Sequence, residues 1–217
     1  MLIYLNKCCA NLKDNKKRYR SLLVWGIISL VSCSSVYLFC NFIASKQTNH
    51  FPLFFDFELS FPLVPWMIYF YISLAILLFL NVILLKDPKV IKAFSVCLIL
   101  TVLIAGMVFI LFPGKLGFTR VTDVTGYQWL FSLLHFVDQP FNLYPSLHIT
   151  YSSLTVFAII DQTKNKLFHL ILILWLIMIG FSVVLVHQHH LFDILTGIIL
   201  AGLVIKFVYR RLIPKEA

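Results

Sequence analysis

Charged side chains are scarce in this sequence. Asp, Glu, Lys and Arg make up 12% of the 217 residues, whereas soluble globular domains carry about 25%. Hydrophobic residues account for 60%, and the mean hydropathy is +0.92. This composition excludes an ordinary soluble domain. It predicts a polytopic membrane protein whose length is largely used by spans of about 20 residues.

Cysteine and internal repetition are also sparse. The five cysteines lie in the N-terminal arm or inside apolar runs, with no paired spacing in an external loop. No disulfide framework is therefore expected. No inverted repeat or pair of interrupted apolar segments is evident, which counts against a secondary transporter.

Six apolar runs are bounded by charged residues or proline. The fourth is the shortest, at about 15 residues, and its first half is polar, which is typical of a helix whose end lines a wet cavity. We expect all six to form one membrane domain, residues 22–209, between a basic arm, residues 1–21, and a basic tail, residues 210–217. The runs are Leu22–Ala44, Leu63–Leu85, Ile91–Phe112, Ser146–Ile160, Leu167–Val186 and Leu191–Tyr209.

Acidic residues are half as numerous as basic ones, which gives a formal net charge of +9. Of the 18 Lys and Arg residues, all but Lys46, Lys115 and Arg120 flank the same ends of the six runs. Because basic loops are retained in the cytoplasm, this pattern predicts an all-α, six-helix transmembrane bundle with both termini cytoplasmic. Anionic lipid headgroups explain the positive charge. A membrane lipid is therefore the expected partner, and nucleic acid is not.

Pro145 and Ser146 mark the start of the fourth run. Proline lacks a backbone N–H group and serine is a favoured N-cap, so the pair predicts a helix start with free N–H groups. Such a terminus binds anions, and His148 in its first turn could give a proton to an oxygen leaving a bound phosphate. The plain alternative is a capped helix with a histidine at the membrane interface.

His189 and Asp193 are four residues apart at the start of the sixth run, so a helix places them on one face. The carboxylate can then fix the imidazole tautomer and raise its nucleophilicity. Such a pair is frequent by chance in a chain with seven histidines and nine acids, but the predicted topology brings it to the same outer face as His148. A zinc or iron site that adds His187 and His190 is an alternative, although a helix start favours an anion over a cation.

Two further groups of polar residues lie in the predicted outer loops. Lys115 and Arg120 follow the third run against the charge bias, and cationic groups there suit phosphate binding, although ordinary loop charge would look the same. Asp138 and Asn142 precede the fourth run and are candidates for holding a headgroup or an acceptor, unless residues 138–140 form only a turn. The Phe-rich stretch 51–61 is typical of an interfacial aromatic belt.

Together these residues resemble the type 2 phosphatidic acid phosphatase and haloperoxidase superfamily, which is recognised by three signatures: Lys-x6-Arg-Pro, Pro-Ser-Gly-His and Ser-Arg-x5-His-x3-Asp. The second reads Pro145-Ser146-Leu147-His148 here, and the third runs from Ser182-Val183 to His189 and Asp193 with the family spacing. In the first signature Arg120 takes the arginine position. Val121 replaces the proline, and Lys115 lies nearer to the arginine than in the family.

The resemblance implies a phosphoenzyme mechanism that needs no metal or organic cofactor. His189 would attack phosphorus, Asp193 would orient it, and His148 would protonate the leaving oxygen. The non-bridging phosphate oxygens would be held by Arg120, Lys115, Ser146 and Ser182. The implied substrate is a lipid phosphate, such as phosphatidic acid, phosphatidylglycerol phosphate or a polyprenyl diphosphate, at the outer face of a bacterial inner membrane.

Two departures are similar to one branch of the superfamily. Val183 stands where the family has an arginine, and Leu147 stands where it has a glycine. The same changes characterise the branch that contains fungal inositolphosphoceramide synthases, whose members can transfer a phosphorylated headgroup to an alcohol instead of to water. Three functions therefore stay open: a lipid phosphate phosphatase, a headgroup phosphotransferase, and a catalytically inactive lipid-binding membrane protein.

Overall fold

The computed structural model describes the backbone of residues 2–213 and the side chains from residue 14 onward. The all-α prediction is confirmed, because 74% of the chain is helical and the described part contains no strand. The helices are α1 (Leu2–Ser45), α2 (Ile68–Ile72), α3 (Leu74–Leu84), α4 (Pro88–Leu111), α5 (Gln128–Val137), α6 (Leu147–Gln162), α7 (Lys166–Leu185), α8 (Leu191–Val204) and α9 (Arg210–Leu212), with short turns η1 (Asp56–Ser60), η2 (Pro65–Met67) and η3 (Ile205–Tyr209).

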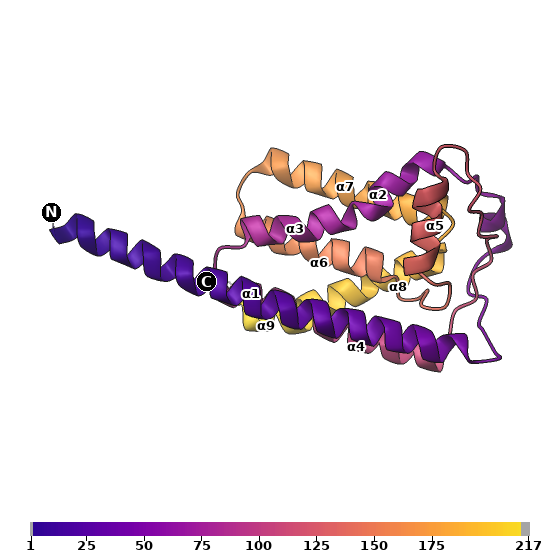
Figure 1. The fold of residues 1–217 in the computed structure, drawn as a ribbon, viewed down its shortest axis with the longest axis horizontal. Coiled ribbons are helices and arrows are strands. Elements are labelled where there is room, and N and C mark those ends of the chain that lie inside the picture. Colours follow the sequence, from indigo (N-terminus) through magenta and orange to yellow (C-terminus); the bar gives the residue numbers. More distant parts are fainter. Residues whose placement is uncertain (1, 214–217) are drawn as a thin grey trace.

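Each predicted apolar run forms a helix or a nearly continuous pair of helices. Five of these segments are long and apolar enough to cross a membrane: Asp14–Ser45, Pro65–Leu84, Pro88–Leu111, Lys166–Leu185 and Leu191–Leu212. The fourth run corresponds to α6, whose 16 residues make it the shortest of the six helical segments that match the predicted runs. The sequence did not predict α5, which lies across one end of the bundle while the long helices run side by side (Figure 1).

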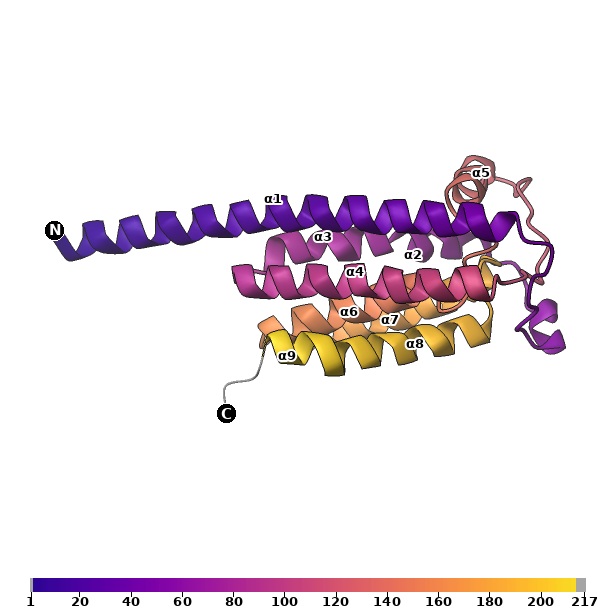
Figure 2. The same cartoon turned by 90° about the horizontal axis from the view of Figure 1, so that it is seen from below.

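The first helix continues without a break through the predicted boundary at residue 22, and its N-terminal end projects beyond the bundle (Figure 2). Arg18 ties it to the end of α3, because its guanidinium donates to the carbonyl oxygens of Val82, Ile83 and Leu85. A cation at a helix C-terminus satisfies carbonyl groups that have no partner within the helix. Of the predicted tail, residues 214–217 lie outside the described part of the chain.

Side-chain caps explain where several helices begin. Asp87 accepts from the N–H group of Lys89 at the start of α4, and Asn165 accepts from Phe168 at the start of α7. Ser146 is the N-cap of α6, as the sequence predicted, and its hydroxyl accepts from the N–H group of Ile149 at 3.4 Å. These caps satisfy donors that would otherwise lack a partner at each helix start.

Helix α6 lies at the centre of the bundle, in contact with α3, α4, α7 and α8. Its closest neighbour at the capped end is Gly197 of α8, where a Cβ atom would lie 2.8 Å from the carbonyl oxygen of Ser146. The Thr150 hydroxyl joins the two helices by donating to the carbonyl oxygens of Ser146 and Gly197, at 2.8 and 3.1 Å. The start of α6 is thereby fixed against the start of α8.

Candidate active site

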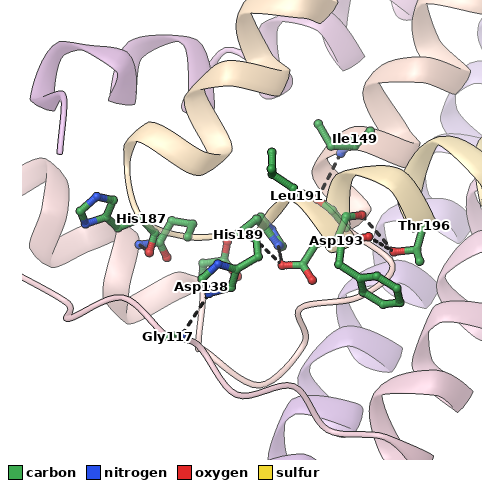
Figure 3. Close-up of polar contacts among 12 residues, drawn as sticks. Gly117, Asp138, Ile149, His187, His189, Leu191, Asp193 and Thr196 are labelled. Carbon is green, nitrogen blue, oxygen red and sulfur yellow. Dashed lines mark hydrogen bonds and ion pairs between the residues drawn. The ribbon is translucent and has the colours of Figure 1, made fainter. Parts of the chain in front are cut away.

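His189 lies in the turn that joins α7 to α8. The chain leaves α7 through His187, whose φ of 58° places it in the left-handed region that most residues avoid. His189 then points toward α8, where its Nδ1 lies 3.2 Å from Oδ2 of Asp193 (Figure 3). The same carboxylate oxygen accepts the N–H group of His190 at 2.9 Å. Asp193 therefore holds both the ring and the backbone at the start of α8.

His148 approaches His189 from the first turn of α6. The two ring centroids are 6.1 Å apart. The N–H group of Ser146 donates to the carbonyl oxygen of Asp193 at 3.1 Å, so the two helix starts are joined by backbone as well. The structure thus brings together the two histidines and the aspartate that the sequence selected, from elements separated by about 40 residues of chain.

Asp138 is a second acidic group beside the two histidines. Single side-chain atoms of Asp138, His148 and His189 all lie within 4.8 Å of one another. The two carboxylate oxygens of Asp138 accept the hydroxyl groups of Tyr37 and Tyr71, one each. Burial raises the pKa of Asp138, but the two histidines and the two tyrosine hydroxyls outweigh it and hold this pKa below its usual value. The group is therefore a carboxylate at neutral pH.

Asp138, His148 and His189 could also hold a metal ion, because two imidazoles and one carboxylate are ligands of zinc and non-haem iron. Both oxygens of Asp138 already accept from a tyrosine, however. The histidines of the alternative metal site lie elsewhere. The ring of His187 stacks on Phe118 at 4.1 Å, and that of His190 pairs with Glu58.

Arg120 reaches the cluster from the loop between α4 and α5. Its guanidinium donates to the carbonyl oxygen of Asp138 and, at 3.1 Å, to Oε1 of Gln188. Its Nε is buried without a hydrogen-bond partner among the described residues. Arg120 therefore lies beside the turn that joins α7 to α8, with one donor unused.

Lys115 is exposed and lies in the same loop as Arg120. The two cations line a pocket of about 390 Å³ among the loops, which we call the loop pocket. Its other lining residues are Thr48, His50, Gly114, Leu116, Phe118, Pro140 and Phe141. The structure thus places Lys115 beside Arg120 but apart from the two histidines.

The remaining predicted residues have structural partners. Ser182 is fully buried in α7, where its hydroxyl donates to the carbonyl oxygen of Ile179 at 2.8 Å. Asn142 donates to the carbonyl oxygen of Tyr37 at 3.1 Å, while its own side-chain oxygen is buried without a partner in the described part of the chain. Asn142 therefore has an acceptor free.

A mostly apolar cavity of about 550 Å³ leads from the two histidines along the membrane-spanning helices. We call it the histidine cavity. Asp138, Asn142, His148 and His189 lie in its polar part, and the rest of the wall comes from α1, α2, α3, α5 and α6. The lining is completed by Cys33, Ser34, Tyr37, Tyr71, Ile72, Leu74, Ala75, Leu78, Trp129, Leu130, Leu133, Leu134, Val137, Leu147 and Tyr151.

Sequence reasoning missed four side chains that hold the site. Tyr37 and Tyr71 contact Asp138, Gln188 contacts Arg120, and Glu58 contacts His190. Gln188 could have been found from its place next to His189. An acid in an apolar aromatic loop was a signal for Glu58, whereas nothing in the sequence distinguished the two tyrosines.

Comparison with known families shows the superfamily to which this chain belongs. The family model of the PAP2 superfamily matches residues 94–215, which is more than half of the chain and includes both histidine motifs. The chain belongs to the PAP2 superfamily. Members of this superfamily are phosphatases or phosphotransferases that act on phosphate esters, which supports an enzyme of that class. No curated protein matches the chain. The PAP2 match begins inside α4, so α1 to α3 lie outside the matched region.

Proposed function

We propose that this PAP2 protein is an integral membrane phosphatase that hydrolyses a lipid phosphate through a phosphohistidine intermediate. The observation that carries the proposal is the arrangement of His189, oriented by Asp193, beside His148 at the polar part of an apolar cavity. Such catalysis requires a nucleophile, a carboxylate that orients it and a second proton-transfer group, all within reach of one bound atom. We assign these roles to His189, Asp193 and His148.

The first step would be attack on phosphorus by Nε2 of His189. The Nδ1–H group of His189 donates a hydrogen bond to Asp193, which leaves the lone pair of Nε2 free to attack. As the N–P bond forms, the bond from phosphorus to the lipid oxygen breaks, and His148 gives that oxygen its proton. In the second step His148 takes a proton from water, whose oxygen attacks phosphorus and breaks the N–P bond. Both histidines return to their starting states.

Several groups would stabilise the charge on the transferred phosphoryl group. Arg120 has an unused donor beside the catalytic turn, and the free N–H groups at the start of α6 add a helix N-terminus. Lys115 would act from the loop pocket at longer range. The Ser182 hydroxyl donates to a carbonyl oxygen within α7, and the Ser146 hydroxyl accepts a backbone N–H group as the cap of α6. We therefore assign these two serines to shaping the site.

A lipid substrate is supported by the wall of the histidine cavity. Helices α1 and α3 belong to candidate membrane spans, and their side chains line the cavity with Leu74, Ala75 and Leu78 among others. An acyl or prenyl chain could lie along this wall while its phosphate meets the histidines. The apolar surface removed from water by such a chain favours lipid phosphates over soluble phosphate esters.

A second candidate function is transfer of a phosphorylated headgroup to an alcohol. It is favoured by Asp138 and Asn142, which put a carboxylate and an unpartnered amide oxygen in the cavity beside the histidines. An anionic group repels a phosphate oxygen but accepts a hydroxyl proton, so these residues suit a hydroxyl-bearing acceptor or headgroup.

Purified protein in lipid nanodiscs tests both candidates. We would supply a panel of lipid phosphates labelled on phosphorus, with and without polyol or ceramide acceptors. Any phosphoenzyme would be trapped by denaturing the protein without acid. Free phosphate as the sole product, with label on His189, supports the phosphatase. A labelled product that contains the acceptor supports transfer. Lipid binding without product at any pH from acid to neutral identifies an inactive lipid-binding protein and contradicts both.

A further inference from the structure

Glu58 is a carboxylate with no exposed surface in a loop that is otherwise open. It lies in η1, between the exposed residues Phe57 and Leu59. Its Oε1 accepts the N–H group of Phe55 at 2.9 Å, which closes its own turn. Its Oε2 accepts the N–H group of Leu191 at 2.8 Å and faces Nδ1 of His190 at 3.3 Å. Most of its partners therefore belong to the start of α8, more than 130 residues away in the chain.

An ion buried in this way is costly unless its lone pairs are satisfied. Three donors surround Glu58, and two of them lie at the N-terminus of α8, where the helix dipole stabilises a negative charge. This environment explains how the carboxylate is tolerated. Glu58, the only buried residue of η1, therefore anchors this loop to the start of α8.

The tautomer of His190 follows from its other contact. The N–H group of Gly117 donates to Nε2 of His190 at 3.0 Å, so Nε2 is an acceptor and the ring proton is on Nδ1, facing Glu58. The ring also lies between Phe54 and Phe118, with both ring centroids at 4.6 Å. His190 is thus a neutral link that transmits the position of Glu58 to the residue next to His189.

Two carboxylates divide the donors at the start of α8 between them. Asp193 takes the N–H group of His190 and Nδ1 of His189, while Glu58 takes the N–H group of Leu191. Without Glu58, Asp193 would be the remaining carboxylate beside three donors. A carboxylate drawn toward Leu191 would hold His189 less well, because its Oδ2 already serves two groups.

We propose that Glu58 is a positioning residue for the nucleophile: by satisfying Leu191 and His190, it leaves Asp193 free to orient His189. This inference rests on the proposed function of the same site. Glu58 lies outside the region matched to the superfamily, so the role belongs to the part of the chain that precedes the matched helices.

The test compares Glu58→Ala with Asp56→Asn, which removes one negative charge from an exposed position in the same turn. Misplacement of a reacting group by about 1 Å costs on the order of 100-fold in rate. We therefore expect Glu58→Ala to lower kcat roughly 10- to 100-fold with little change in KM, and Asp56→Asn to change neither. Glu58→Gln keeps one oxygen for Leu191 and His190 but turns an NH2 group toward the N–H group of Phe55, so it should recover part of the lost kcat.

A double-mutant cycle with His190→Asn separates positioning from loss of folded protein. If Glu58 acts through this link, the double variant should be much less than multiplicatively impaired. Fully multiplicative losses, or losses that vanish once activity is normalised to the folded fraction measured by thermal unfolding, would overturn the inference.

Binding of orthovanadate, a tetrahedral anion that becomes five-coordinate when a nucleophile adds to it and then resembles the phosphoryl group in transfer, gives a readout that needs no turnover. Its affinity should fall in Glu58→Ala by about the factor seen in kcat, whereas inorganic phosphate should bind as before. Wild-type protein that binds vanadate without turning over any lipid contradicts the proposed function alone. An active wild type whose Glu58→Ala variant matches Asp56→Asn contradicts the positioning role alone. If the wild type neither binds vanadate nor turns over, both proposals fail.

Discussion

Each histidine of the site has a carboxylate near it, and the two carboxylates differ in their surroundings. Asp193 shares one oxygen between His189 and the backbone of α8, which suits a fixed orienting role. Asp138 is held by two tyrosine hydroxyls and by Arg120 through its own carbonyl group. These contacts form two hydrogen-bonded groups, one around Asp193 and one around Asp138, and the loss of a member leaves its buried partners unsatisfied.

Removal of either histidine should separate their roles. We expect His189→Ala to abolish turnover, because no other imidazole lies beside Asp193 in the geometry that frees Nε2. His148→Ala should lower kcat by at least 10²- to 10⁴-fold, the range typical of acid–base catalysis. Phosphate release from the preferred lipid measures both. Activity retained by His189→Ala would refute the assignment of the nucleophile.

The two cations of the loop pocket should differ in importance. Arg120 contacts Asp138 and also Gln188, the residue next to His189, whereas Lys115 is exposed. Arg120→Ala should therefore reduce kcat/KM more than Lys115→Ala does, measured at the same ionic strength so that screening is equal. The reverse ranking would mean that the first signature is aligned wrongly in this chain.

Helices α6 and α8 position the two histidines by the closeness of their first turns. The contact depends on Gly197, because any side chain there would meet the backbone of Ser146. Backbone cannot rotate away as a flexible side chain can, so the helices themselves would have to separate. Small residues at such crossings are common in membrane bundles for this reason.

Gly197→Ala should therefore damage both stability and catalysis. Overpacking of this kind costs about 1–3 kcal/mol, and separation of the two helix starts should lower kcat further. Gly202→Ala in the same helix is the matched control, since a Cβ atom there has no neighbour within 4 Å. Thermal unfolding in detergent and lipid phosphate turnover are the measurements. Equal behaviour of the two variants would contradict the importance of the crossing.

Much of this element-level architecture could be predicted from the sequence. Apolar runs indicated the helices, and the spacing of His189 and Asp193 indicated their contact. The crosswise helix α5 was missed because its ten residues are too short to register as a span. The contacts of Tyr37 and Tyr71 with Asp138 join residues 101 and 67 positions apart. Local periodicity carries no information about such pairs, which depend on how whole helices pack.

At the scale of the whole molecule, the mostly apolar histidine cavity is distinct from the loop pocket, which two cations line. The histidine cavity runs along the helices, while the loop pocket lies among the segments that connect them. Arg120 lines the loop pocket and donates to Asp138, which lines the cavity. The proposed reaction would take place where these two compartments meet.

Narrowing of the cavity should discriminate between substrates by chain length. Ala75 lines the cavity, whereas its neighbour Ile76 points away from it and is 56% exposed. Ala75→Trp should raise KM for a long-chain lipid phosphate about tenfold, since two methylene groups denied burial cost roughly 1.6 kcal/mol. A short-chain analogue should be unaffected. Ile76→Trp is the control, and a similar KM in both variants would contradict lipid binding in the cavity.

The two compartments also bear on the direction of the proposed reaction. Cleavage of one ester bond would yield a hydrophobic alcohol and an inorganic anion, which dissolve in different media and would depart through different openings. Once apart, the two fragments would seldom meet again at the same histidine. Dilution of the anion into water would then drive net hydrolysis, even where the chemistry at phosphorus is close to balance.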